Sequence, residues 1–143
     1  MLRPLALVLL LLLAPAARAF SPGELGAFAR SAGIEDMRGF VETVTELRAS
    51  GRLPPRYLTK TDAERLGWLP GRNLCQIAPG KAIGGDPFHN AERRLPELRG
   101  RRWREADLDA PCGRRGPKRL VFSDDGLIFV TTDHYRSFQP VPE

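Results

Sequence analysis

The 143-residue sequence is poor in the residues that metal and thiol sites require. It has only two histidines and two cysteines, none of them at the spacings typical of zinc sites, and it has no dense carboxylate loop of the calcium-binding kind. No serine stands in a Gly-x-Ser-x-Gly pattern, and no internal repeat, heptad pattern or low-complexity segment is present. These absences predict a protein without a metal or a cofactor, and they exclude the common serine hydrolase signature.

Long apolar runs are also scarce. The run from Leu5 to Leu13 is much shorter than the roughly 20 residues that a membrane helix needs. Arg3 precedes it, and Ala17-Arg18-Ala19 follows with the small-x-small pattern of a signal peptidase site. We therefore expect residues 1–19 to be a signal peptide and the mature protein to be secreted, without a membrane anchor. The alternative is an uncleaved anchor.

The remaining residues suffice for one domain with a modest core. The chain has 22 Lys and Arg against 17 Asp and Glu, so losing two arginines with the signal peptide leaves a net charge of about +3. A mildly basic protein is attracted to polyanions such as RNA, although this signal alone is weak. Residues 20–33 are expected to form a poorly ordered lead-in or a short capping segment, and 34–143 the domain itself.

Two helices are predicted in the first half of the domain. Apolar residues recur at three- and four-residue steps over 34–47, as on one face of a helix, and a Ser-Gly pair then supplies a stop. A shorter helix is expected to begin at Thr59, a residue type that caps helix N-termini, and to end at Gly67. Prolines and glycines over 69–80 predict mainly loop, with one short helical possibility at 74–77.

Strands are predicted in the second half. Short apolar runs separated by turn signals follow one another at 82–83, 102–108, 119–122, 127–131 and 137–138. An Asp-Gly pair between the third and fourth runs is a strong hairpin signal. Helices first and strands afterwards indicate an α+β fold with an antiparallel sheet.

Cys75 and Cys112 form the one possible cysteine pair. In an oxidising compartment an even number of cysteines usually indicates a disulfide. The bond would close a loop of about 37 residues and stabilise the fold by roughly 4 kcal/mol in the chain-entropy treatment. A catalytic thiol is the rival interpretation, and it is disfavoured because an exposed free thiol outside the cell would oxidise. We therefore expect the disulfide.

Few residues are available for acid–base chemistry near neutral pH. His134 lies in a predicted loop at a sheet end, where a side chain can face substrate, although a lone loop histidine is more often an ordinary surface residue. Alternation along 102–108 places Trp103, Glu105 and Asp107 on one face of a rigid strand. The cations available to a site beside them are Lys60, Arg114, Arg115 and Arg119. A base, an acid and fixed cations suit phosphoryl transfer.

Six short blocks carry a resemblance to a known family. They are Tyr57-Leu58-Thr59-Lys60, Leu66-Gly67-Trp68, Ala78-Pro79-Gly80-Lys81, Ile83-Gly84-Gly85-Asp86, Arg102-Trp103-Arg104-Glu105-Ala106-Asp107 and Thr131-Thr132-Asp133-His134-Tyr135. In this order and spacing they resemble the barnase-type, guanyl-preferring microbial ribonucleases from about Phe40 to Phe138, with a one-residue deletion near 70–72. The resemblance implies helices packed on a five-stranded antiparallel sheet. It also implies metal-independent cleavage of single-stranded RNA by transphosphorylation, through a 2′,3′-cyclic phosphate that is hydrolysed more slowly.

The resemblance implies a role for each candidate. Glu105 would take the proton from the ribose 2′-hydroxyl, and His134 would protonate the departing 5′-oxygen. The need for a 2′-hydroxyl makes DNA a non-substrate. The other implied roles are phosphate binding by Lys60, Arg115 and Arg119, positioning of these arginines by Asp107, and packing against the substrate by Tyr135.

A guanine-binding loop is implied at residues 88–92. Glu92 stands where the family accepts hydrogen bonds from guanine N1 and N2, and the other expected substrate contacts are Phe88, His89 and Asn90. Backbone donors of this loop would bind guanine O6, so we expect guanine preference.

Three positions depart from the family pattern. His89 replaces a usual serine, Ala91 a usual arginine, and Arg114 an aromatic residue. His89 is either a new RNA contact or a neutral surface replacement, and the second is favoured. The departures leave open the strength of guanine preference and the binding of flanking phosphates.

The cysteines are a further departure, since barnase itself has none. The segments that carry Cys75 and Cys112 are neighbours in the family's architecture, so the resemblance implies that their disulfide braces the loop bearing Arg114 and Arg115.

The partners expected are RNA and a small acidic inhibitor of the barstar type, and the protein is expected to be a monomer. One rival is a cationic binding module that kept the fold and lost catalysis. Another is an antimicrobial protein that acts through net charge alone, whose activity would survive Glu105→Ala.

Overall fold

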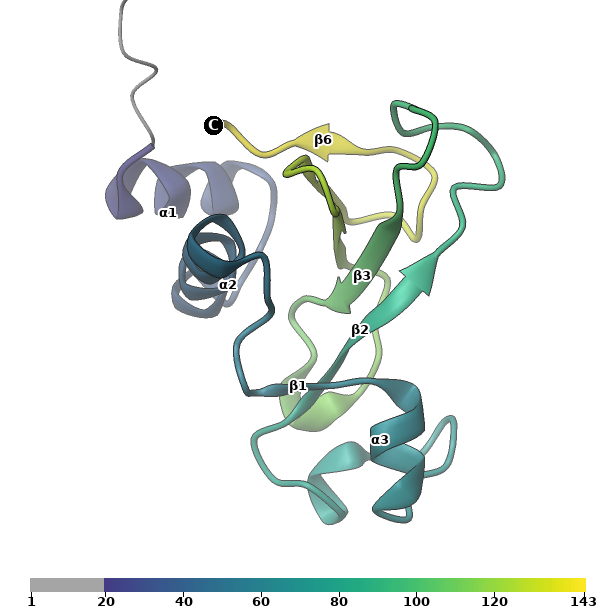
Figure 1. Cartoon of the computed structure of the whole chain (residues 1–143). Coiled ribbons are helices and arrows are strands. Elements are labelled where there is room, and N and C mark those ends of the chain that lie inside the picture. Colours follow the sequence, from purple (N-terminus) through teal and green to yellow (C-terminus); the bar gives the residue numbers. More distant parts are fainter. Residues whose placement is uncertain (1–19) are drawn as a thin grey trace, which may run out of the picture.

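The computed structural model describes residues 20–143 (Figure 1). The expected signal peptide at 1–19 lies outside the described residues. The elements are α1 (Pro22–Ser31), α2 (Met37–Ser50), β1 (Tyr57–Leu58), α3 (Lys60–Arg65), η1 (Leu74–Gln76), β2 (Ala82–Phe88), β3 (Trp103–Asp107), η2 (Pro111–Gly113), β4 (Arg119–Ser123), β5 (Ile128–Thr131) and β6 (Gln139–Pro140), where η marks a short 3₁₀ helix. Among the described helices, none has the length and apolar character needed to cross a membrane.

Helix α1 (Pro22–Ser31) occupies most of residues 20–33, the segment expected to be a poorly ordered lead-in or a short capping segment. The Ser21 side chain accepts a hydrogen bond from the Glu24 amide, and the Glu24 carboxylate accepts one from the Ser21 amide, which makes a capping box. Leu25 and Ala29, four residues apart on one helical face, are buried in the same core as α2. The polar, glycine-containing composition of this segment gave no clear helical pattern, so the burial of Leu25 and Ala29 was not predicted.

The two helices predicted in the first half are confirmed. Helix α2 buries Phe40, Val44 and Leu47 on one face, and it ends at Gly51, whose left-handed φ of 72° suits glycine. Thr59 caps α3 by accepting a hydrogen bond from a backbone amide of the first turn. The short helical possibility at 74–77 corresponds to η1.

The sheet has the strand order β1-β2-β3-β4-β5-β6. Strands β2 to β6 pair antiparallel, as expected, and β1 adds a sixth strand that runs parallel to β2. A strand of two residues is too short to show alternation, so β1 could not be read from the sequence. Strand β6 occupies 139–140, just after the predicted run at 137–138. Ser137 instead hydrogen-bonds Asp133, and Phe138 packs against the apolar cluster that contains Trp103 and Val121.

The sheet separates two apolar clusters. Leu120 and Phe122 of β4 join the core beneath α1 and α2, and Figure 1 shows both helices on one side of the sheet. Val121 lies between them in sequence and therefore faces the other side, where it packs with Trp103. Glu105 pairs with Val121 across β3 and β4, so it also lies on the face that these helices leave open.

Candidate active site

Glu105 occupies the middle of β3, a strand paired on both sides, which holds its carboxylate in a fixed position. The residue is only 8% exposed. The Tyr135 hydroxyl donates a 2.6 Å hydrogen bond to Oε2, and Arg115 Nη2 lies 3.8 Å from Oε1. Trp103, Glu105 and Asp107 are alternate residues of β3 and therefore lie on one face of the strand, as predicted.

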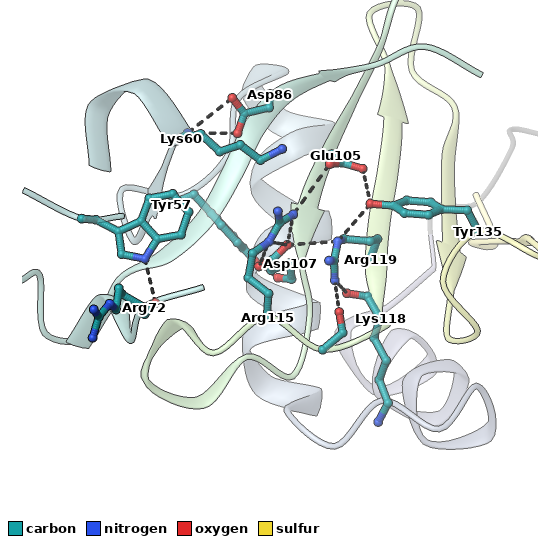
Figure 2. Close-up of polar contacts among 12 residues, drawn as sticks. Tyr57, Lys60, Arg72, Asp86, Glu105, Asp107, Arg115, Lys118, Arg119 and Tyr135 are labelled. Atoms are coloured by element: carbon teal, nitrogen blue, oxygen red, sulfur yellow. Dashed lines mark hydrogen bonds and ion pairs between the residues drawn. The ribbon is translucent and has the colours of Figure 1, made fainter. Parts of the chain in front are cut away.

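Asp107 binds two arginines beside Glu105 (Figure 2). Its side chain is 1% exposed, and its oxygens lie 2.9 Å from Arg115 Nε and 3.1 Å from Arg119 Nε. A guanidinium nitrogen of Arg119 also donates to the carbonyl oxygens of Gly116 and Lys118. Burial acts to lower the pKa of Arg115, but the hydrogen bonds and charge of Asp107 outweigh it and raise the pKa. Asp107 thus fixes two permanently charged cations next to the Glu105 carboxylate.

We expect Asp107→Asn to destabilise the fold by about 3–5 kcal/mol, because it removes the buried carboxylate that pairs with both Arg115 and Arg119. Urea unfolding followed by circular dichroism measures the change. Asp125→Asn is a matched control. The Asp125 carboxylate also pairs with an arginine but is far more exposed than Asp107, so its loss should cost much less. Equal losses in the two variants would contradict the structural role of Asp107.

Tyr135 connects the carboxylate to the cations. Its hydroxyl donates to Glu105 and accepts a 3.1 Å hydrogen bond from Arg119 Nε, and its ring stacks on Phe88 at a centroid distance of 5.2 Å. Burial and the neighbouring Glu105 raise the pKa of Tyr135 to about 12. The hydroxyl therefore remains a neutral hydrogen-bond donor well above neutral pH.

Tyr135→Phe should lower kcat about tenfold, because a hydrogen bond to a charged group contributes roughly 1.5–3 kcal/mol and here positions the carboxylate. The phenylalanine ring keeps the stacking on Phe88, so KM should change little. Steady-state cleavage of a short RNA at pH 7 and pH 9 measures both constants. The ratio of wild-type to variant kcat should be the same at both pH values, since neither approaches the pKa of Tyr135. An unchanged kcat at both values contradicts the positioning role.

His134 lies in the turn between β5 and β6, with a positive φ of 57°. Its backbone amide donates to Pro117 O at 3.1 Å, which ties the turn to the segment between Arg115 and Arg119. The imidazole is exposed, and its centroid lies 4.9 Å from that of the Tyr135 ring. Within residues 20–143 the imidazole makes no hydrogen bond, so it is available to a substrate.

Asp133 shapes this turn, a role that the sequence interpretation missed. One of its oxygens accepts hydrogen bonds from Thr131 Oγ1 and from the amides of Arg136 and Ser137, and the other accepts from Ser137 Oγ. The Ser137 hydrogen bonds lower the pKa of Asp133 to about 2. An aspartate just ahead of a polar turn is a known turn signal, and it could have identified this role.

Lys60 is the first residue of α3, and Figure 2 shows its side chain pointing toward Glu105 and Arg115. Its amide donates to the carboxylate of Asp86 on β2 at 3.0 Å, which joins the helix to the sheet. Tyr57 gives a second support, because its hydroxyl donates to the Asp107 carbonyl oxygen at 3.0 Å. Both supports lie in blocks that the resemblance identified, but neither had been assigned a role.

The expected guanine loop begins at the end of β2. Phe88 contributes its stacking on Tyr135, which brings the loop next to the carboxylate site. Asn90 has a positive φ of 45°, and its buried side-chain amide exchanges two 3.0 Å hydrogen bonds with the backbone of Leu95. Its side chain therefore holds the loop in shape, and its backbone carbonyl oxygen also accepts a 2.9 Å hydrogen bond from the Arg93 amide. Glu92 is exposed and pairs with Arg94 at 2.8 Å, and the His89 side chain is exposed.

Arg114 and the two cysteines lie at the margin of the site. Arg114 is exposed, next to Arg115. Cys75 and Cys112 are both free thiols in this structure, on the neighbouring elements η1 and η2.

Among residues 20–143, no three His, Cys, Asp or Glu side chains gather in a way that could hold a metal ion.

The arrangement therefore has a buried carboxylate, two fixed arginines and an exposed histidine on the open face of a mostly antiparallel sheet. On an α+β fold of this topology, these features define the class of small microbial ribonucleases.

Comparison with known proteins gives the family within this class. A ribonuclease family model matches residues 42–142, so the chain belongs to the ribonuclease family, and it is of the barnase type. It is 54% identical over 88 residues to a ribonuclease of Heyndrickxia coagulans. These 88 residues are 61% of this chain and 81% of that protein. A ribonuclease of Bacillus intermedius has the same identity over 88 residues, and the chain spans 54% of its length.

A more distant relative is the guanyl-specific ribonuclease St of Saccharopolyspora erythraea. It is 39% identical over 56 residues, which are 38% of this chain and 55% of that protein.

Proposed function

We propose that this protein is an endoribonuclease that cleaves single-stranded RNA on the 3′ side of guanine without a metal ion. The observation that carries the proposal is the buried Glu105 carboxylate, held by Tyr135 and facing the cations that Asp107 fixes. RNA carries its own nucleophile, the 2′-hydroxyl beside each phosphate. A site that supplies a base, an acid and positive charge is therefore sufficient for cleavage.

In the first step Glu105 takes the 2′-hydroxyl proton while the 2′-oxygen forms a bond to phosphorus. The bond from phosphorus to the 5′-oxygen breaks, and His134 donates a proton to that leaving oxygen. The products are a 2′,3′-cyclic phosphate and a free 5′-hydroxyl. In the slower second step water attacks the cyclic phosphate, with the two residues exchanging their roles as acid and base.

Arg115, Arg119 and Lys60 stabilise the negative charge that grows on the phosphate oxygens. Arg115 and Arg119 are already oriented by Asp107, so little reorganisation is needed when the charge develops. Arg119 is also buried, at 3% exposure, which strengthens its field at the reacting phosphate. Asp107 itself acts by positioning these cations.

Guanine preference follows from the loop at 88–92 and from the guanyl-specific relative. The side chain of Asn90 fixes the loop backbone, so the amides that would meet guanine O6 are oriented before RNA binds. Glu92 would exchange its contact with Arg94 for the N1 and N2 donors of guanine. Guanine is the base that presents two adjacent donors on this edge.

A pair of short RNAs tests the preference, one with a single guanine and one with adenine in its place. We expect cleavage after the guanine and at least about tenfold slower cleavage of the adenine RNA. Glu92→Gln should reduce this discrimination, whereas Glu97→Gln, a nearby exposed control, should retain it. Equal cleavage of both RNAs by the wild-type protein would overturn the assignment of guanine.

Secretion and the protein partners form a separate part of the proposal. The apolar run and the Ala17-Arg18-Ala19 pattern support export with cleavage after Ala19. A monomer with a cationic active site would be inhibited by a small acidic protein of the barstar type, which complements that charge. The N-terminal residue and mass of the exported protein, measured by mass spectrometry, test the cleavage site.

A further inference from the structure

Residues 110–116 form a loop that contains η2, carries Arg115 and leads toward Arg119. Its internal hydrogen bonds are local, from the Gly113 amide to Ala110 O and from the Arg114 amide to Pro111 O. Cys112 and Gly113 both have positive φ, at 57° and 66°. A cavity of about 150 Å³ borders the start of the loop and is lined in part by Ala110 and Cys112. The cavity therefore borders the loop at Ala110 and Cys112, on either side of Pro111.

One close contact joins this loop to η1. A Cβ added to Gly113 would lie 2.4 Å from Leu74 Cβ, so the backbone of Gly113 rests directly on that side chain. Leu74 is fully buried. Cys75 follows Leu74 in sequence and Cys112 precedes Gly113, so the two cysteines flank the contact on both elements.

Cys75 and Cys112 lie on the two neighbouring elements, η1 and η2, that this contact joins. Cys75 is partly buried and Cys112 is exposed, so a small oxidant can reach the pair. Their hydrogen-bond interaction is the main reason that the pKa of the Cys112 thiol is raised. Cys112 is also three residues before Arg115, whose guanidinium binds Asp107 and approaches Glu105.

We propose that Cys75 and Cys112 are a redox modification site, whose oxidation to a disulfide fixes the loop that positions Arg115 and so raises the ribonuclease activity. This inference rests on the proposed function. A small-molecule disulfide such as oxidised glutathione is the oxidant. A protein thiolate attacks it to give a mixed disulfide and one free small thiol. The second cysteine then displaces the other small thiol, so the protein loses two protons and two electrons and the oxidant becomes two thiols.

The functional effect follows from the position of the bond. Without it, the loop is held by the packing of Gly113 on Leu74 and by the ion pairs of Arg115. The disulfide adds a covalent link at Cys112, three residues before Arg115. Small displacements of a positioning group can cost up to about 10²-fold in rate, and we expect about a tenfold lower kcat/KM in the reduced protein.

The experiment compares the full-length mature protein after treatment with oxidised glutathione and after treatment with dithiothreitol. Thiol titration should find no free thiol in the first sample and two in the second, both monomeric and equally folded by circular dichroism. Cleavage of a short RNA should be about tenfold slower in the reduced sample and should recover on reoxidation. The Cys75→Ser, Cys112→Ser double variant should match the reduced protein under both treatments.

A second variant separates positioning of Arg115 from general stabilisation. In Arg115→Ala, oxidation should no longer change the cleavage rate, because the group that the bond positions is absent. Hydrogen exchange of amides 110–116 should be slower in the oxidised wild-type protein, whatever its activity.

Three outcomes overturn the inference. These are thiols that stay free or pair only between molecules, equal cleavage rates of the oxidised and reduced proteins, and a redox effect that persists in Arg115→Ala. If the protein cleaves no RNA in either redox state, the proposed function is contradicted. If hydrogen exchange of amides 110–116 is also the same in the oxidised and reduced proteins, the disulfide does not fix the loop, and the redox inference is overturned as well.

Discussion

Replacing Glu105 with glutamine is expected to lower kcat/KM for RNA cleavage by about 10²- to 10⁴-fold, the usual contribution of general acid–base catalysis. Glutamine has nearly the same shape and still accepts a hydrogen bond from Tyr135, so the fold should be kept. It cannot accept the 2′-hydroxyl proton. The expected loss is therefore chemical, and it should appear in kcat more than in KM.

The measurement is steady-state cleavage of a short fluorescent RNA, with circular dichroism confirming that the variant is folded. Glu42→Gln is the matched control, because Glu42 is exposed on α2, on the far side of the sheet from the site. The control should cleave at the wild-type rate. If Glu105→Gln and Glu42→Gln have equal kcat/KM, Glu105 is not the base.

Replacing His134 with alanine should cause a loss of similar size, about 10²- to 10⁴-fold, because the leaving 5′-oxygen then departs without a proton. The imidazole is exposed and unbonded among residues 20–143, so its removal should leave the stability of the fold almost unchanged. The His134 and Asp107 variants should therefore differ in stability, because only the loss of Asp107 is expected to lower the free energy of unfolding. His89→Ala removes the other histidine of the chain and is compared in kcat, which should stay close to the wild-type value because His89 is assigned no proton transfer.

A substrate with sulfur in place of the bridging 5′-oxygen assigns the acid. A thiol is far more acidic than an alcohol, so a thiolate leaves without protonation. His134→Ala should recover to within about tenfold of the wild-type rate on this RNA, whereas Glu105→Gln should stay slow. Recovery of Glu105→Gln in place of His134→Ala would reverse the assigned roles.

Much of this site could be predicted because its residues lie in elements with local signals. The alternation along 102–108 placed Glu105 and Asp107 on one face before any contact was known. Thr59 marked the start of the helix that carries Lys60. The order of the six blocks supplied the remainder, since spacing over most of the chain is far more specific than any single block.

Contacts between distant segments could not be predicted from local patterns. The hydrogen bond from Tyr135 to Glu105 joins positions 30 residues apart, and it depends on the sheet order and on a turn with positive φ at both His134 and Tyr135. Non-glycine residues rarely adopt that conformation, and no propensity scale indicates it. The turn persists because Asp133 binds the backbone around it.

The helix α1 and the role of Asn90 were missed for a related reason. Helix α1 is stabilised by packing of Leu25 and Ala29 on α2 and by its capping box, and a weak amphipathic pattern does not reveal such tertiary support. Asn90 stands where a substrate contact was expected, but its side chain satisfies the backbone of Leu95 inside the loop. A buried loop needs such partners for its polar groups.

The two rival functions predict different results from these variants. A binding module that had lost catalysis would bind RNA equally well as the wild-type protein and as the Glu105→Gln variant, and neither form would cleave it. An antimicrobial action through net charge would survive Glu105→Ala. The arrangement of Glu105, Tyr135 and the two arginines favours the enzyme, because a charge-based binder needs no buried carboxylate among its cations.

The most direct test uses a short RNA with one guanosine, incubated with the mature protein in excess chelator, and the same strand carrying 2′-deoxyguanosine at that position. Mass spectrometry identifies the products. We expect a 2′,3′-cyclic phosphate on the guanosine of the first strand, a free 5′-hydroxyl on the other fragment, and no cleavage of the second strand at that position. Cleavage of the deoxyguanosine strand there, or loss of all cleavage in chelator, would contradict the proposed function.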